Sequence, residues 1–273
     1  FEIFSKNKIT IDKIYLDIGE ISLKELKKIL LKTKPSNFKS IIFNNLTNGS
    51  LSSKIDLQFD EDFMLIDYQL SGYVKNLSGF FQKMDFKKAN FIYSIGNKKG
   101  KISSLNGTIN QIPVNSGEIS FIKDKIIAIN STIKSDLELD QNKLKQIFPS
   151  TKFFSSNNQV FLKGNITSLL NLEFDNSFKV KKFDLNFKGK ILESFLKLEK
   201  PLEYITFKEK IDKVKFKNTD VLFTYNNKKE KKITLEGKYI LDETPLNFYF
   251  LNKFNETSND INLNIDIINS LNF

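Results

Sequence analysis

The chain has 273 residues and a formal net charge of +10; its 42 basic residues are all lysine, and it has no cysteine, histidine or tryptophan. Without histidine or cysteine, Ser-His-Asp and Cys-His catalytic arrangements and thiolate or imidazole metal sites are excluded. Nucleic acid is a weaker candidate for an anionic partner than lipid head groups, because the chain lacks arginine for bidentate base contacts and its lysines are scattered through turns and polar strand positions.

The chain begins with Phe1 rather than methionine, and we expect it to be a fragment of a longer protein. No stretch approaches the roughly 20 apolar residues that a membrane-spanning helix requires. Residues 1–11 lack the uninterrupted apolar run and the cleavage site of a signal peptide. Any export signal or membrane anchor is therefore expected outside this sequence.

Two short helices are predicted. Residues 22–25 (SLKE) form a capping box ahead of a short apolar pattern, and Pro35 marks its end. Residues 140–148 repeat this arrangement more weakly and are followed by Pro149. Residues 150–158 are expected to be a connecting loop.

Most of the remaining chain reads as β-strands, because apolar residues alternate with Lys, Asn, Asp, Ser and Gln. This alternation is typical of a sheet with one face shielded from water, here called the dry face, and one face exposed to solvent. Turns are expected at residues 60–62 and 226–229. The candidates for the dry face are Ile55, Leu57, Phe59, Ile66, Tyr68, Leu70, Phe91, Tyr93, Ile95, Leu170, Leu172, Phe174, Leu185, Phe187, Val221, Phe223 and Tyr225.

The chain also repeats itself. Residues 49–60 (GSLSSKIDLQFD) match residues 164–175 (GNITSLLNLEFD) at an offset of 115, from Gly49 to Gly164. Residues 86–95 match residues 216–225 at an offset of 130, which also aligns Gly107 with Gly237. Recurrence over such lengths indicates a tandem array.

The repeats predict two modules, residues 1–139 (repeat core from about residue 22) and residues 140–273, whose strands continue in one sheet. The dry face of such a sheet must be covered. A second sheet would give two closed sandwiches with dry cores, as in a structural or adhesive protein. Alternatively, the face holds a hydrophobic ligand, and both modules then share one continuous sheet. The second arrangement is the one expected here.

A family resemblance favours the ligand-holding arrangement. Residues from about Ile41 to Phe273 resemble the AsmA-like proteins of Gram-negative envelopes in their lysine- and asparagine-rich strand meanders. The Gly-x-Ile/Val strand entries at residues 72–74, 107–109 and 117–119, and the tandem helix-then-strands module, carry the likeness. The resemblance implies an all-β fold with two short helices, an elongated, twisted antiparallel sheet that curls into an apolar groove.

The same resemblance implies a function. The segment would conduct phospholipid between the inner and outer membranes, in the periplasm, tethered to the inner membrane through a segment outside this chain. Its partners would be acyl chains and, through the parent protein, both membrane surfaces. No catalytic residue, cofactor, metal, nucleic acid or small-molecule substrate is expected, and the chain is predicted not to be an enzyme.

Two short patterns could suggest other chemistry. Ser36 and Lys39 fit a Ser-x-x-Lys pattern, but no Ser-Asp-Asn or Lys-Thr-Gly companion is present and lysine is abundant. Asp60, Glu61 and Asp62 could contact calcium, yet such sites need more oxygen ligands at defined spacing. We interpret the first as a chance match and the second as a solvated turn.

Overall fold

The computed structural model describes residues 12–81, 84–147, 159–175, 179–202, 210–227, 230–241, 244–255 and 257–266. The expected loop at residues 150–158 and part of the expected turn at residues 226–229 lie outside these ranges. The chain divides into two compact units. Unit 1 comprises Phe1–Ile109 and Ser116–Ile129, and unit 2 comprises Asn110–Asn115 and Asn130–Phe273.

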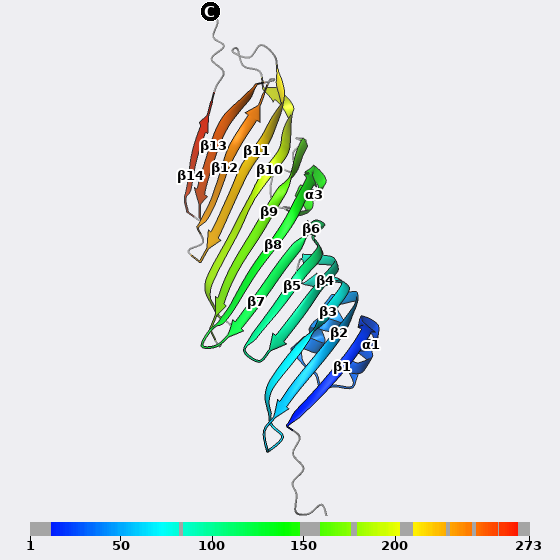
Figure 1. Cartoon of the computed structure of the whole chain (residues 1–273). Coiled ribbons are helices and arrows are strands. Elements are labelled where there is room, and N and C mark those ends of the chain that lie inside the picture. The colour runs from blue at the N-terminus through cyan, green and yellow to red at the C-terminus, as the bar shows by residue number, and fades with distance from the viewer. Residues whose placement is uncertain are drawn as a thin grey trace, which may run out of the picture. The chain divides into compact units, whose positions relative to one another are not determined.

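Unit 1 contains an edge strand, two helices and a run of long strands (Figure 1). Its elements are β1 (Lys13–Ser22), α1 (Leu23–Leu31), α2 (Asn37–Asn45), β2 (Leu46–Phe59), β3 (Leu65–Phe81), β4 (Met84–Gly96), β5 (Lys99–Ile109) and β7 (Ser116–Lys123).

Unit 2 has a similar order of strand, helix and long strands. The first residues of β8 belong to unit 1, and the rest of this strand belongs to unit 2. Its elements are β6 (Ile112–Val114), β8 (Ile127–Asp140), α3 (Gln141–Ile147), β9 (Gln159–Phe174), β10 (Val180–Leu202), β11 (Ile211–Asn226), β12 (Lys231–Ile240), β13 (Pro245–Phe254) and β14 (Asn259–Ile265).

The predicted all-β class is confirmed. In the described ranges, 14 strands belong to one open sheet in the order β1-β2-β3-β4-β5-β7-β8-β9-β10-β11-β12-β13-β14, with β6 paired to β5. Within each unit the strand pairs of known register are antiparallel. Neighbours along the chain are mostly neighbours in the sheet, because short turns join antiparallel strands directly. The module boundary expected near residue 140 stays a prediction.

The number of helices differs from the prediction of two, because three are present in the described ranges. The capping box of α1 forms as expected: the Ser22 hydroxyl accepts the Glu25 N–H at 3.2 Å, and a Glu25 carboxylate oxygen accepts the Ser22 N–H at 2.8 Å. The unexpected helix is α2, whose cap is Ser36, accepting the Lys39 N–H at 3.1 Å. The Ser36-x-x-Lys39 pattern is therefore a helix start.

The repeat at offset 130 has a structural basis in a bulge that occurs once in each unit. Lys88 on β4 has φ 52°, and Asn218 on β11, its counterpart, has φ 50°. Each bulge shifts the register with the next strand at equivalent positions. Beside each bulge lies an aligned glycine, Gly107 or Gly237, where a Cβ atom would come within 3.0 Å of the facing strand. The repeated sequence therefore encodes the same local bend twice.

Few side chains are deeply buried. Among the described residues the buried apolar ones are Leu23, Ile42, Ala89, Val114, Leu139, Leu144, Tyr239 and Phe248, and no large side chain is less than 2% exposed. The helices pack at restricted places: α1 on β1 and β2, α2 on β2 and β3, and α3 on β9. The described strands form a single sheet, so the closed cores of two sandwiches are not seen in this part of the chain.

Candidate ligand-binding surfaces of the two units

In unit 1, strand register gathers the predicted apolar residues on one face. Ile55 on β2 lies opposite Leu70 on β3, which in turn lies opposite Ile95 on β4. Directly opposed residues project from the same side of an antiparallel sheet, so these three form a row across the strands. The predicted residues that share this face in register are Ile55, Leu57, Tyr68, Leu70, Phe91, Tyr93 and Ile95.

The other two predicted residues of unit 1 lie at the end of this surface. Phe59 pairs with Leu65 across a register shift at the turn between β2 and β3. Ile66 lies within that shift, between Leu65 and Asp67, and is 55% exposed. The turn itself forms as predicted, with the Asp60 N–H bonded to the Met64 carbonyl at 3.0 Å.

Glycines let aromatic rings lie flat on this face. Tyr93 stands opposite Gly72, and its hydroxyl reaches across to donate to the Ser52 carbonyl at 3.0 Å. Phe121 on β7 lies opposite Gly100, where an added Cβ atom would come within 2.2 Å of the ring. Phe121 is absent from the sequence-based candidates. The alternation after Gly117 is the signal that could have placed it on the apolar face.

Unit 2 presents an equivalent apolar face. Leu170, Leu185 and Tyr225 form one row across β9, β10 and β11. A second row joins Phe187, Phe223 and Ile233. The predicted residues that share this face in register are Leu170, Leu172, Leu185, Phe187, Val221, Phe223 and Tyr225, while Phe174 lies at a register shift where β9 ends.

Aromatic side chains are concentrated on the face of unit 2. The rings of Phe187 and Phe223 are 5.7 Å apart, and those of Phe183 and Tyr225 are 5.1 Å apart. A further pair, Phe216 and Phe248, has a separation of 5.4 Å. Such pairs favour packing beyond their buried area. Phe216 was missed from sequence because the bulge at Asn218 changes the parity of β11. Phe183 and Phe248 lie on uninterrupted stretches of β10 and β13, in step with Leu185 and Phe250, so strand alternation was the signal that could have placed them.

Tyr239 shows how a polar atom is accommodated beside this face. Its side chain is buried, and its hydroxyl donates to the backbone carbonyl of Asp266 at 2.5 Å. Burial, followed by the nearby Asp266 charge, raises the pKa of the Tyr239 hydroxyl. The phenol therefore stays neutral, and its oxygen is satisfied within the protein.

The two apolar surfaces remain accessible to a ligand. Residues on the central strands of each unit are half-buried by their cross-strand neighbours. Toward the sheet edges exposure rises to 44% at Leu16 on β1 and to 61% and 56% at Ile261 and Leu263 on β14. A monomeric protein seldom leaves a contiguous apolar area of this kind uncovered without a binding role.

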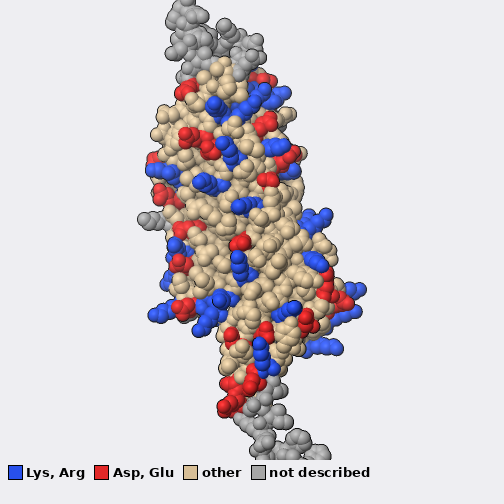
Figure 2. Space-filling view, in the orientation of Figure 1, with Lys and Arg blue, Asp and Glu red and all other residues tan. Residues whose placement is uncertain are grey.

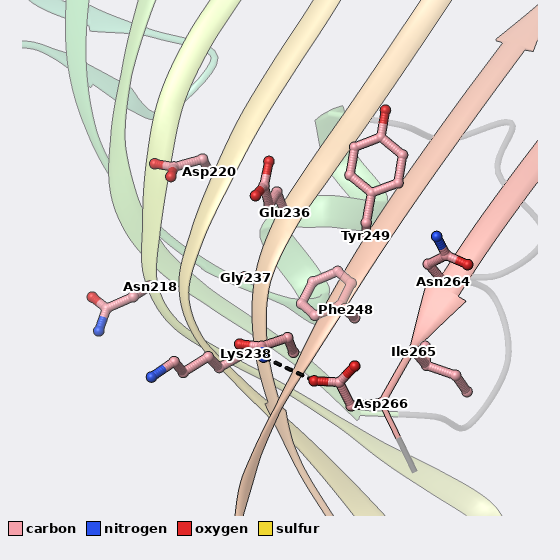
Figure 3. Close-up of a pocket in the computed structure, with 11 residues that line it drawn as sticks. Asn218, Asp220, Glu236, Gly237, Lys238, Phe248, Tyr249, Asn264, Ile265 and Asp266 are labelled. Carbon is pink, nitrogen blue, oxygen red and sulfur yellow. Dashed lines mark hydrogen bonds between the residues drawn. The ribbon is translucent and has the colours of Figure 1, made fainter.

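The surface of each unit carries a hollow. One, of about 480 Å³, is in unit 2, where Asp220, Glu236 and Tyr249 extend from successive strands (Figure 3). The Asn247 amide there donates to Asp266 at 2.8 Å. A second, of about 270 Å³, is lined in part by Gln69 and Phe121 in unit 1.

Charged side chains of both signs are interspersed over the face shown in Figure 2. In the described ranges, no three acidic residues are grouped so that they could hold a metal ion. None of the described helices is long and apolar enough to span a membrane.

Comparison with known proteins adds no family to these observations: no family model, curated protein or solved structure matches the chain.

Proposed function

We propose that the chain is a non-enzymatic lipid-binding segment, whose apolar sheet faces hold phospholipid acyl chains. The observation that carries the proposal is the apolar face of each unit, which is aligned by register and has no second sheet packed on it among the described strands. The AsmA-like resemblance of the sequence is consistent with this role. On this proposal the chain works in the periplasm as part of a longer, membrane-tethered protein.

The physical reason is the cost of exposing hydrocarbon to water. Each exposed CH₂ group of an acyl chain costs about 0.8 kcal/mol, so a continuous row of Ile, Leu, Phe and Tyr side chains lowers the barrier to moving a lipid. No acid, base or nucleophile is required. The same contact covers the apolar face of the protein, so both partners gain from binding.

The test is native mass spectrometry with lipid extraction on the purified chain. We expect several phospholipids to copurify with each chain. Phe91→Lys together with Phe223→Lys should remove them, because each change places a charge on an apolar face. The matched control is Ile92→Lys with Leu222→Lys, one residue along the same strands, where the side chains are 53% and 38% exposed on the other face.

Circular dichroism of the same variants distinguishes a ligand-covered face from a protein-covered one. On an uncovered face the charged variants should retain their strand signal. If Phe91→Lys and Phe223→Lys unfold the chain, and the unchanged chain is a stable, lipid-free monomer, the charge was buried against protein. That result would replace the lipid proposal with the structural sandwich.

A further inference from the structure

We propose that the polar side of unit 2 carries a docking surface for an anionic phospholipid bilayer. The surface, which we call the basic patch, lies where β9, β10, β11 and β12 pair. It consists of Lys163, Lys197, Lys213, Lys215, Lys217 and Lys238, around Glu193 and two phenylalanines.

Strand register brings these residues together from distant parts of the sequence. Lys197 lies opposite Lys213, and Lys217 lies opposite both Glu193 and Lys238. With adjacent strands about 4.8 Å apart and alternate residues about 6.7 Å apart, six lysines occupy roughly 14 Å by 13 Å. The prediction that the lysines are scattered, and not gathered in one patch, is therefore wrong for these strands of unit 2. The sequence of a single strand does not show which residues lie opposite it.

The basic patch faces away from the apolar surface of unit 2. On the same strands the alternate residues pair among themselves, with Leu196 opposite both Val160 and Val214. Docking at the basic patch is thus independent of whether acyl chains bind the apolar face.

Within the described part of the chain, acidic side chains offset only part of the charge of the basic patch: Glu193 lies opposite Lys163 and Lys217, and Glu236 lies beside Lys238. None of its six lysines forms an ion pair there, although ion pairs occur elsewhere in unit 2, such as Lys182 with Asp184. Like charges directly opposite each other, as at Lys197 and Lys213, destabilise a sheet. An anionic partner that covers the patch would relieve this repulsion.

The centre of the basic patch favours a bilayer over other polyanions. The rings of Phe161 and Phe195 are stacked with centroids 5.7 Å apart, and the Lys213 ammonium is 4.1 Å from the Phe195 centroid. Aromatic rings between lysines suit a membrane interface, where rings meet the acyl boundary and ammonium groups meet phosphates. Lysine provides point charges without the planar geometry of arginine, which suits diffuse head-group charge rather than base recognition.

The test is vesicle flotation with the whole chain. Vesicles of phosphatidylcholine containing phosphatidylglycerol should bind it, and binding should weaken as salt is added. We expect the affinity for these vesicles to fall on the order of 100-fold in the triple variant Lys197→Gln, Lys215→Gln and Lys217→Gln. Each lysine near the membrane surface contributes about fivefold to the affinity. The control, Lys54→Gln, Lys99→Gln and Lys123→Gln, removes the same charge from exposed lysines of unit 1 and should retain most of the binding.

Three outcomes would overturn the proposal. Equal losses in the two triple variants would mean that net charge alone drives binding. Equal binding to pure phosphatidylcholine vesicles would assign the interaction to apolar contacts. The surface would be assigned to nucleic acid if the patch lysines were required for binding a single-stranded oligonucleotide but not for binding vesicles. Copurified lipid, measured in parallel, reports on the apolar face separately.

Discussion

The Tyr93 hydroxyl donates to the Ser52 carbonyl across an intervening strand, at 3.0 Å. Its path crosses Gly72 on β3, which lies opposite Tyr93 in one direction and Ser53 in the other. An added Cβ atom at Gly72 would lie 2.0 Å from the same Ser52 oxygen and 2.9 Å from the Tyr93 hydroxyl. The glycine thus allows a tyrosine on the apolar face to satisfy its polar end and remain flat on the sheet.

The first prediction is that Gly72→Ala destabilises unit 1. The methyl group would collide with backbone rather than with a flexible side chain, so a loss of about 2 kcal/mol is expected. Gly19→Ala on β1 is the control, since nothing lies within 4 Å of its added Cβ atom. Urea denaturation of both variants measures the difference. Equal midpoints would show that the backbone around Gly72 can move aside.

A second prediction concerns the two equivalent bulges. Lys88 and Asn218 both adopt the left-handed conformation, with φ 52° and 50°. This conformation is strained for lysine but tolerated by asparagine. Lys88→Gly should therefore raise the free energy of unfolding, by about 0.5 kcal/mol after the entropy cost of glycine, whereas Asn218→Gly should be close to neutral. The urea denaturation midpoints of both variants measure these changes in stability. A larger increase in stability for Asn218→Gly than for Lys88→Gly would contradict the idea that the left-handed conformation is strained at Lys88.

The third prediction is a pH dependence that arises at Glu20. Hydrogen bonds from Lys75 at 2.7 Å, Ser50 at 2.6 Å and Tyr73 at 3.1 Å lower the pKa of Glu20 to about 2. A carboxyl group whose pKa is lowered by folding stabilises the native state above its unfolded pKa, near 4.5, and loses this contribution as pH falls toward 2.

Glu20→Gln should accordingly be less stable than the unchanged chain at neutral pH, and the difference should shrink between pH 4.5 and pH 2. Thermal unfolding across this range measures it. Glu61→Gln, in the turn between β2 and β3, is the control for removing one carboxylate. A difference between Glu20→Gln and the unchanged chain that stays constant with pH would exclude the Glu20 carboxylate as its source.

A fourth prediction addresses β14, which pairs with β13 and has every residue exposed. Such an edge, with Ile261 and Leu263 more than half exposed, promotes strand addition between molecules. Leu263→Lys should lower self-association, measured by light scattering, while the strand signal is kept. Asn262→Lys adds the same charge on the other face and should have a smaller effect. Equal effects would mean that net charge, and not the apolar edge, controls association.

Much of the architecture was predictable because alternation is a local property. Residues such as Ile55, Leu57, Leu170 and Leu172 occupy one face wherever a strand runs straight. The capping box at Ser22 likewise depends on residues three positions apart. The second helix was missed because Pro35 was interpreted as an end, whereas Ser36 directly after it begins a new helix.

The sequence alone therefore determined the strand alternation, the apolar character of one face and the repeat that aligns Gly107 with Gly237. Only the tertiary structure decided which residues meet across strands. Bulges at Lys88 and Asn218 change strand parity, so Phe216 joins the apolar face although it differs in parity from Val221. Register likewise assembles the basic patch from lysines on four strands. Backbone pairing between distant segments sets both features, and no single stretch of sequence contains that information.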